Sequence, residues 1–425
     1  MEVIRLLRIL YQYLPVTFIV LANLAFVFTW NYLSERRYFE DCPLLTISFA
    51  AFFFIFFCIL FFIATKAHQT FETEPSAYEP ISIIVPVYNE ELHIFSVLKS
   101  IQNSHYPTEK IELIVINDGS SDNSQNEIIR FSEQYKGEFT FINLKENRGK
   151  KNGLLKGFEI AKNEIIVTID SDTFIEKDGI IHLIRKFEKE VSAVSGYTDV
   201  HNHDQNLITR IQWYEYFVSH HLFKAFESFY QSVLCCPGCF SAYRKESLNS
   251  IIDEFKSSSV YGFPIDYAED RYLTALLLRN NHKVVYSSQA RAHTIVPNSL
   301  KSFFIQRFRW IKSWFINSLF LVKTALHRPF VYSLYFYLSL IFNILIVSVP
   351  FLFVYLIFTD QVVIILSGLY VVLLYILFHL WKTKKLKLLL PILFFLFTIS
   401  VYSWLLVAAV SKIKDSSWGK RVGES

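Results

Sequence analysis

Two carboxylates, Asp170 and Asp172, stand one residue apart directly after the apolar run 165–169. A run of this kind, without Gly or Pro and ended by polar residues, predicts a buried parallel strand. Open α/β sheets bind ligands beyond the carboxyl ends of such strands. Two carboxylates this close repel each other unless a cation lies beside them, and carboxylate plus phosphate oxygens suit Mg²⁺ or Mn²⁺. We therefore expect a divalent cation that carries a diphosphate; the simpler alternative is an acidic turn that caps the next helix.

Polar loops also follow the earlier predicted strands. Glu90 comes after strand 81–87, Asp118 comes after strand 111–116, and Lys150 lies in the loop after a third strand. The carboxyl ends of parallel strands share one edge of a sheet, so these side chains should lie near the paired carboxylates. Asp118 suits a hydrogen bond from a base imide, and Lys150 can balance phosphate charge as a point cation. Each residue alone is more simply explained as a solvated loop residue, but the ordered set describes a nucleotide-diphosphate site. Neither a G-x-G-x-x-G nor a G-K-[ST] motif occurs, so neither a dinucleotide fold nor a P-loop is supported.

Asp270 is the candidate general base. A sugar hydroxyl that attacks an anomeric carbon must lose a proton, and a carboxylate within hydrogen-bond distance can take it. A divalent metal would stabilise the departing diphosphate as a Lewis acid. The alternative is structural, because Glu269 and Asp270 open a predicted helix and acidic residues are favoured there by the helix dipole.

Residues 306–310, QRFRW, combine groups that can bind a sugar and a phosphate. Trp310 offers an apolar face for a sugar ring, and Arg309 offers a planar fork for phosphate oxygens. The predicted helix 303–327 that carries them mixes apolar and basic residues in a way that suits a membrane interface, although a buried domain helix would look similar. The alternative for the motif is an interfacial Trp flanked by arginines that reach toward water.

Three of the five cysteines, Cys235, Cys236 and Cys239, lie close together in the predicted soluble part. Zinc binding is disfavoured because no fourth ligand follows at a suitable spacing. No even disulfide framework is evident, so we expect reduced thiols. The intervening Pro-Gly pair breaks regular structure, and we expect a loop in which Gly238 and Cys239 line an acceptor site.

The composition points to a membrane protein with an α/β domain. The chain has 425 residues, of which 52% are hydrophobic, and contains 42 Phe and 24 Tyr. Both exceed the globular norm. The alternation of predicted strands and helices from residue 81 onward indicates a doubly wound, mostly parallel sheet. A net charge of +4 does not favour nucleic acid as a partner.

Several apolar stretches are long enough to span a bilayer. Arg5 and Arg8 place the start of the first stretch inside, and the lysines after the last stretch also favour the inside. Three full spans after a cytoplasmic domain would end outside, so the number of C-terminal spans stays open and one late segment is expected to be bent or re-entrant. The predicted spans are 14–30, 44–65, 331–358, 362–380 and 388–410.

The ordered motifs VYNEE (87–91), NDGSSD (117–122), DSD (170–172), EDR (269–271) and QRFRW (306–310) resemble those of the processive family 2 glycosyltransferases. These are the membrane synthases of hyaluronan, chitin, chitooligosaccharide and cellulose. The resemblance covers about residues 81–314. It returns at 417–421, SWGKR, which is similar to the W-G-T-R motif of hyaluronan and chitin synthases with Lys420 in place of Thr.

The resemblance implies a GT-A fold, a UDP-sugar donor, Mg²⁺ or Mn²⁺, inversion at the anomeric carbon and secretion of the polymer through the same chain. Asp172 would hold the metal and Asp270 would be the base. Gly238, Cys239 and Trp310 would contact the acceptor. The implied UDP-sugar-binding residues are Tyr88, Glu90, Asp118, Lys150, Asp170, Gln306, Arg309, Trp310, Trp418 and Arg421.

The kind of polymer stays open from the sequence. Residues 236–240, CPGCF, resemble chitin synthases, and 269–274 resemble chitooligosaccharide synthases, whereas 312–315 and the compact length resemble bacterial hyaluronan synthases. All use UDP-GlcNAc, so we expect this donor, with UDP-glucuronate as an open second donor. A growing polysaccharide and the lipid bilayer would be the other partners. The alternatives are a non-processive transferase that loads a polyprenyl phosphate, and a transporter whose cytoplasmic domain only binds a nucleotide sugar.

The expected organisation places the catalytic domain on the cytoplasmic face of the plasma (inner) membrane. Its parts are two N-terminal transmembrane helices (1–70), a cytosolic GT-A domain (71–300), interface helices with QRFRW (301–329), C-terminal transmembrane helices (330–411) and the WGKR tail (412–425).

Overall fold

The computed structural model describes residues 59–60, 62–64, 78–188, 190–257, 259–260, 262–265, 269–345, 372–373, 376, 378–380, 383 and 389–413. The chain divides into two compact units, Met1–Ile63 with Ser348–Ser400, and Ala64–Val347 with Val401–Ser425. The second unit contains the sheet and all of the candidate site residues that the structure describes.

The predicted spans fall largely outside the described residues. This is true of 14–30, of most of 44–65 and 362–380, and of the second half of 331–358. The last predicted span, 388–410, is described as α16 (Leu389–Phe397), a π-helix (Thr398–Tyr402) and α17 (Ser403–Ser411). Within the described ranges, no helix has both the length and the apolar character needed to cross a membrane.

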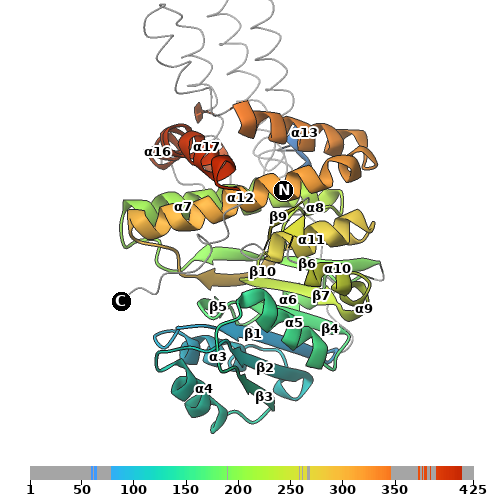
Figure 1. The fold of residues 1–425 in the computed structure, drawn as a ribbon, viewed down its shortest axis with the longest axis vertical. Helices are drawn as coiled ribbons and strands as arrows, with labels where there is room; N and C mark the ends of the chain where they lie inside the picture. The colour runs from blue at the N-terminus through green and yellow to red at the C-terminus, as the bar shows by residue number, and fades with distance from the viewer. Residues whose placement is uncertain are drawn as a thin grey trace, which may run out of the picture. The chain divides into compact units, whose positions relative to one another are not determined.

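An eight-stranded mixed sheet forms the centre of the second unit (Figure 1). Its spatial order is β3-β2-β1-β4-β7-β6-β10-β5. β1, β2, β3 and β4 are mutually parallel neighbours, and β6 is parallel to β10. The strands are β1 (Ile81–Val87), β2 (Ile111–Asn117), β3 (Glu138–Asn143), β4 (Ile165–Ile169), β5 (Thr173–Ile175), β6 (Val191–Val200), β7 (Phe240–Arg244) and β10 (Lys283–Thr294), with β8 (Ser259–Val260) and β9 (Phe263–Pro264) as a separate pair.

The expected parallel α/β sheet is confirmed, with two differences. β7 lies antiparallel between β4 and β6, and β5 is antiparallel to β10, so the sheet is mixed. β10 continues past Tyr286, because its pairing with β6 resumes at Arg291 after a register shift. Such an irregularity lets one strand bend and continue along its partner.

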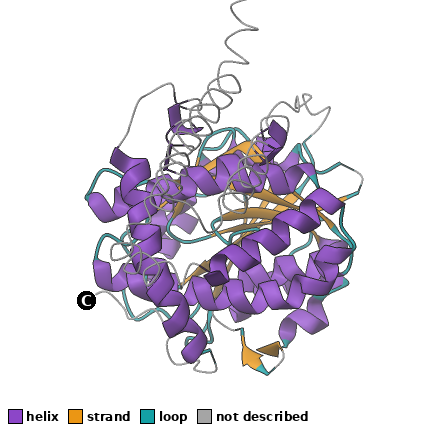
Figure 2. Ribbon diagram, turned by 90° about the horizontal axis from the view of Figure 1, so that it is seen from above, coloured by secondary structure: helices purple, strands orange, loops and turns teal. Residues whose placement is uncertain are grey.

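Helices cover both faces of this sheet (Figure 2). Every residue of β1, β2 and β4 is buried, as expected for strands covered on both sides. One close approach depends on glycine, since a Cβ at Gly157 would lie 2.6 Å from Cγ2 of Ile84. The helices packed around the sheet are α3 (Ile94–Gln102), α4 (Ser124–Ser132), α5 (Lys150–Ile160), α6 (Gly179–Ile184), α9 (Lys245–Asn249) and α10 (Ile252–Lys256).

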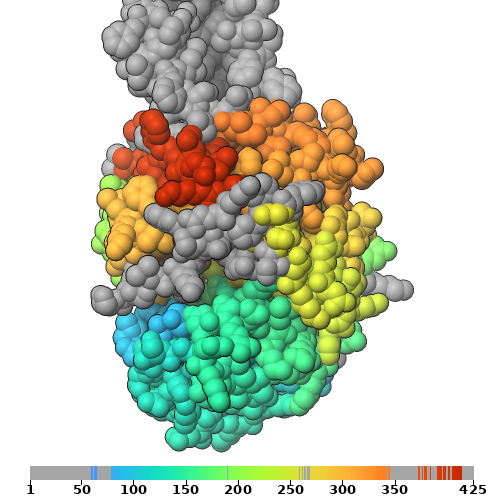
Figure 3. Space-filling model, viewed as in Figure 1, coloured from blue at the N-terminus to red at the C-terminus, as the bar shows by residue number. Residues whose placement is uncertain are grey.

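Longer helices follow in the second half of the unit. Residues 207–229 form α7 (Leu207–Val218), a π-helical segment (Ser219–Lys224) and α8 (Ala225–Phe229). α11 (Glu269–Arg279) packs against α12 (Leu300–Leu326), which also contacts α13 (Phe330–Leu345) and α17. In the space-filling view, segments before residue 190 (blue to green) form the lower part, the yellow segments lie directly against them, and the orange helices α12 and α13 lie farther up (Figure 3).

Candidate active site

The Asp118 carboxylate organises the loop that carries Lys150. Asp118 follows β2 and is buried, with 3% of its surface exposed. Its Oδ1 accepts a hydrogen bond from the backbone N–H of Arg148 at 2.9 Å, and its Oδ2 accepts one from that of Gly149 at 2.7 Å. Gly149 has a φ of +91°, which favours glycine. Asp118 therefore fixes the residue immediately before α5, and so the start of the helix that presents Lys150.

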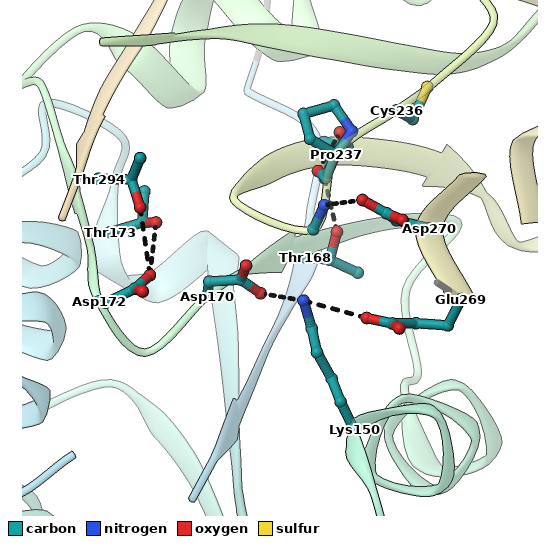
Figure 4. Close-up of polar contacts among 12 residues, drawn as sticks. Lys150, Thr168, Asp170, Asp172, Thr173, Cys236, Pro237, Glu269, Asp270 and Thr294 are labelled. Carbon is teal, nitrogen blue, oxygen red and sulfur yellow. Dashed lines mark hydrogen bonds and ion pairs between the residues drawn. The ribbon is translucent and has the colours of Figure 1, made fainter. Parts of the chain in front are cut away.

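Lys150 lies between two carboxylates (Figure 4). Its Nζ is 2.5 Å from Oδ1 of Asp170, just past β4, and 3.2 Å from Oε1 of Glu269, the first residue of α11. Burial favours the neutral amine, but the charges of Asp170, Glu269 and Asp270 outweigh it and raise the pKa of Lys150. The side chain is therefore a fixed ammonium ion at the carboxyl edge of the sheet.

Gly238 brings the Pro-Gly loop onto this ion pair. A Cβ at Gly238 would lie 2.3 Å from Nζ of Lys150 and 3.0 Å from Oδ1 of Asp170, so a larger residue there would displace the end of the Lys150 side chain. The backbone N–H of Gly238 donates to Oδ2 of Asp270 at 3.4 Å. The Pro-Gly loop and the Lys150 side chain, which are far apart in the sequence, therefore meet beside Asp270, the expected base.

Asp172 lies at the same edge, beside two threonines (Figure 4). Its Oδ1 accepts hydrogen bonds from Oγ1 of Thr173 and of Thr294, each at 3.3 Å. Burial, followed by the charges of Asp170 and Asp172, raises the pKa of the Cys239 thiol well above its usual value. The thiol, expected to face the acceptor, therefore stays protonated beside both carboxylates.

The donor set fits a Mg²⁺ or Mn²⁺ ion that is completed by its substrate. Among the residues that the structure describes, no group of three or more His, Cys, Asp or Glu side chains forms a closed metal site. Mg²⁺ is commonly bound through one or two carboxylates with phosphate and water oxygens supplying the rest. A carboxylate at Asp172, held by two hydroxyl donors, meets that requirement.

Tyr88 and Glu90 follow β1 and are half-buried. The backbone N–H of Glu90 donates to Oγ of Ser124 at 2.7 Å, and Oδ1 of Asn89 accepts from the N–H of Ser121 at 2.8 Å. The loops after β1 and β2 are therefore joined to each other, which places Tyr88 and Glu90 on the same side of the sheet as Asp118.

The motif QRFRW lies on α12, where Gln306, Arg309 and Trp310 are half-buried. The Trp310 ring lies 6.2 Å from the ring of Tyr216 on α7. Burial raises the pKa of Tyr216 well above its usual value, so its phenol stays protonated beside the Trp310 ring. Trp418 and Arg421 lie outside the described residues.

Two side chains of the site were not expected from the sequence. Glu269 was considered only as a helix-start residue, yet it is the second partner of Lys150. Arg307, the unassigned second position of QRFRW, is completely buried and contacts Gln306 and Trp310. Its place inside a motif was the one signal that could have singled it out.

Known proteins with similar sequences identify the family of the chain. A family model described as chitin synthase matches residues 120–423. An N-acetylglucosaminyltransferase of Neorhizobium galegae is 31% identical over 252 residues, 58% of each chain. A hyaluronan synthase of Streptococcus pyogenes is 30% identical over 291 residues, 66% of this chain and 68% of that protein. The chain thus spans less than two thirds of the length of the first of these relatives.

A solved structure is similar over most of the chain. It is the mannosyltransferase PcManGT from Pyrobaculum calidifontis in complex with GDP-Man and Mn²⁺, with a TM-score of 0.61 at 18% identity, covering 86% of this chain and 97% of that one. At this identity the likeness concerns the fold alone, and it confirms the expected GT-A-like glycosyltransferase fold.

Proposed function

The chain belongs to the chitin synthase family, and from this premise we propose that it is a processive, inverting glycosyltransferase that uses UDP-GlcNAc. Its product is a β-linked polysaccharide of the chitin or hyaluronan type. The observation that carries the proposal is the convergence of Asp170, Glu269 and Gly238 on the Lys150 ammonium, with Asp270 adjacent. Relatives with N-acetylglucosaminyltransferase and hyaluronan synthase activity support the donor.

Asp270 acts as the general base in this proposal. The acceptor hydroxyl gives its proton to the carboxylate while its oxygen forms the bond to the anomeric carbon and the bond to UDP breaks. The N–H of Gly238 at 3.4 Å from Oδ2 holds the carboxylate beside the acceptor loop. Inversion follows because attack and departure occur on opposite faces of the sugar.

Lys150 and Asp172 serve the leaving group. The divalent ion, when bound, stabilises the negative charge that develops on the departing diphosphate. Asp172 is the protein ligand, and Asp170 keeps the Lys150 ammonium at the same edge. Tyr88, Glu90 and Asp118 bind the uridine side, and Gln306, Arg309 and Trp310, with Trp418 and Arg421 from the tail, cover the UDP and the acceptor.

The bilayer is the proposed setting for secretion. The support is the sequence itself, whose apolar stretches of bilayer length flank the α/β domain and carry cationic residues at their ends. On this basis the catalytic domain faces the cytoplasm from the plasma (inner) membrane, and the polymer leaves through the chain's own membrane part.

A donor-dependence assay tests the proposal. Membranes that contain the full chain would receive UDP-GlcNAc alone, UDP-glucuronate alone, or both, with Mn²⁺. Polymer from UDP-GlcNAc alone indicates a chitin-type product, and polymer only from the pair indicates a hyaluronan-type product. Long products support processive synthesis, a single transfer to a polyprenyl phosphate indicates the non-processive alternative, and no transfer with any donor rejects the proposal.

A further inference from the structure

Arg307 is the largest completely buried side chain in the part of the chain that the structure describes. It lies on α12 and its Nη2 is 2.6 Å from Oε2 of Glu215 on α7, an ion pair between residues 92 positions apart. The Glu215 side chain is 24% exposed, but the Arg307 charge is taken fully out of water, and a pair of this kind contributes little net stability compared with well-packed apolar side chains. Its presence at this position therefore calls for a role other than stability.

The same guanidinium group also contacts two residues of the QRFRW motif. Nη1 of Arg307 donates to Oε1 of Gln306 at 3.1 Å. The guanidinium carbon lies 4.2 Å from the centroid of the Trp310 ring, within the range of a cation–π contact. Gln306 and Trp310 are two of the five residues that we expect to cover the UDP and the acceptor, and Arg307 touches both without being one of them.

Glu215 ties this arrangement to a third helical segment. Its Oε1 accepts a hydrogen bond from the hydroxyl of Tyr402 at 2.7 Å, just before α17. α17 packs on α12 through an apolar cluster that includes Phe308, Ile311 and Leu406. Both oxygens of Glu215 are therefore occupied, and the carboxylate cannot turn away from Arg307 without breaking a second contact.

We propose that Glu215 and Arg307 are a positioning pair that sets the orientation of Trp310 and Gln306 toward the acceptor sugar. The inference rests on the proposed function, in which Trp310 stacks on that sugar. Lysine cannot replace Arg307, because an ammonium group lacks the planar fork that bonds Glu215 and Gln306 at once and stacks on the indole. Loss of the pair therefore disturbs the binding of the acceptor and, through Gln306, the covering of UDP, and leaves the base Asp270 intact.

The test compares Arg307→Lys and Glu215→Gln with Arg244→Lys in the full chain in detergent. Arg244 is a matched control on β7, since its Nε and Nη2 donate to the carbonyls of Val191 and Glu188 and its guanidinium lies over the Phe187 ring. Kinetics would use UDP-GlcNAc and a short β-linked GlcNAc oligomer as acceptor. For Arg307→Lys and Glu215→Gln we expect the acceptor KM to rise about tenfold or more, with kcat changed by less than about threefold.

The double variant that combines Arg307→Lys with Glu215→Gln tests whether the two side chains act through one shared contact or through separate effects on the site. Because the two side chains act through one contact, combining the substitutions should add little to either alone. Unchanged acceptor KM values in both single variants, or an equal rise in Arg244→Lys, would overturn the inference.

A spectroscopic measurement keeps the inference testable if the wild-type chain transfers no sugar, which would reject only the proposed function. The fluorescence emission spectrum of Trp310 is obtained by subtracting the spectrum of Trp310→Phe from that of the wild-type chain. Because the guanidinium lies 4.2 Å from the ring, Arg307→Lys should shift this emission whereas Arg244→Lys should not. An emission that is the same in Arg307→Lys as in the wild type would overturn the inference.

Discussion

The Nζ of Lys150 occupies the space that a side chain at Gly238 would need, since a Cβ there would lie 2.3 Å from that nitrogen. The first prediction follows from this contact. Gly238→Ala forces Lys150 away from Asp170 and should lower the transfer rate about tenfold to 100-fold, as for other small displacements in active sites. Gly153→Ala in α5 is the control, because its Cβ would meet Pro86 at an ordinary 3.4 Å. Equal rates for the two variants would contradict the placement of Lys150 in the reaction.

Asp270→Asn should remove the base but keep the shape of the site. We expect transfer to fall by roughly 100-fold to 10,000-fold, the usual contribution of general base catalysis. UDP affinity, measured by calorimetry, should stay within about twofold because the amide still fits beside Gly238. Asp253→Asn on α10 is the control, since that carboxylate is 92% exposed. A nucleotide-binding transporter would keep its function in Asp270→Asn, which distinguishes the two classes.

The hydroxyl of Thr294 should tune metal affinity through Asp172. Thr294→Val removes one of the two hydroxyl donors at 3.3 Å from Oδ1. Loss of such a supporting contact typically weakens metal binding about 10-fold to 100-fold. Mn²⁺ binding followed by paramagnetic resonance in the presence of UDP would show the shift, and Thr140→Val on β3 is the control. An unchanged Mn²⁺ affinity would show that Asp172 does not ligate the ion.

His220 should make the stability of the full chain fall in mild acid. Burial, followed by the charge of Lys224, lowers the pKa of His220 well below 6.5. Its Nδ1 donates to the carbonyl of Tyr216 at 2.9 Å and its Nε2 accepts from the N–H of Thr198 at 3.4 Å, so the folded protein holds it neutral. Below about pH 6.5 the unfolded chain takes up a proton that the folded chain does not, so stability falls as the pH is lowered.

Denaturant titrations between pH 5 and pH 8 check this prediction. His220→Gln should reduce the slope below about pH 6.5 by up to about 1.4 kcal/mol per pH unit, the value for one proton. His282→Gln is an informative comparison, because burial also lowers the pKa of His282 but a smaller part of its surface is covered. A slope unaffected by His220→Gln would mean that this imidazole is protonated in the folded chain.

The local part of the architecture was predictable from residue pattern. β1, β2 and β4 are uninterrupted apolar runs, and each ends within one residue of its predicted end because polar loop residues follow at once. The clustering of Asp118, Lys150 and Asp170 followed from one rule about the carboxyl edge of parallel strands. That rule needs no knowledge of side-chain contacts.

Pairings between distant segments were not predictable in the same way. The direction of β7 depends on which strands it lies between, and a short strand of five residues, FSAYR, is compatible with either direction. The partner of Arg307 lies 92 residues earlier on a different helix, and no local pattern marks Glu215 as that partner. Glu269 was hidden for a related reason, since an acidic residue at a helix start already has a sufficient local explanation.

The antiparallel direction of β7 affects which part of the site can change during evolution. Phe240 pairs with Ile169, so the turn at residues 236–239 enters the site from the beginning of its strand, whereas the nucleotide-side loops leave from the ends of theirs. Residues inserted before β7 would remodel the pocket for the incoming hydroxyl without altering the register of β1, β2 or β4. Selection can therefore change the acceptor chain that is extended without changing the nucleotide sugar that is used as donor.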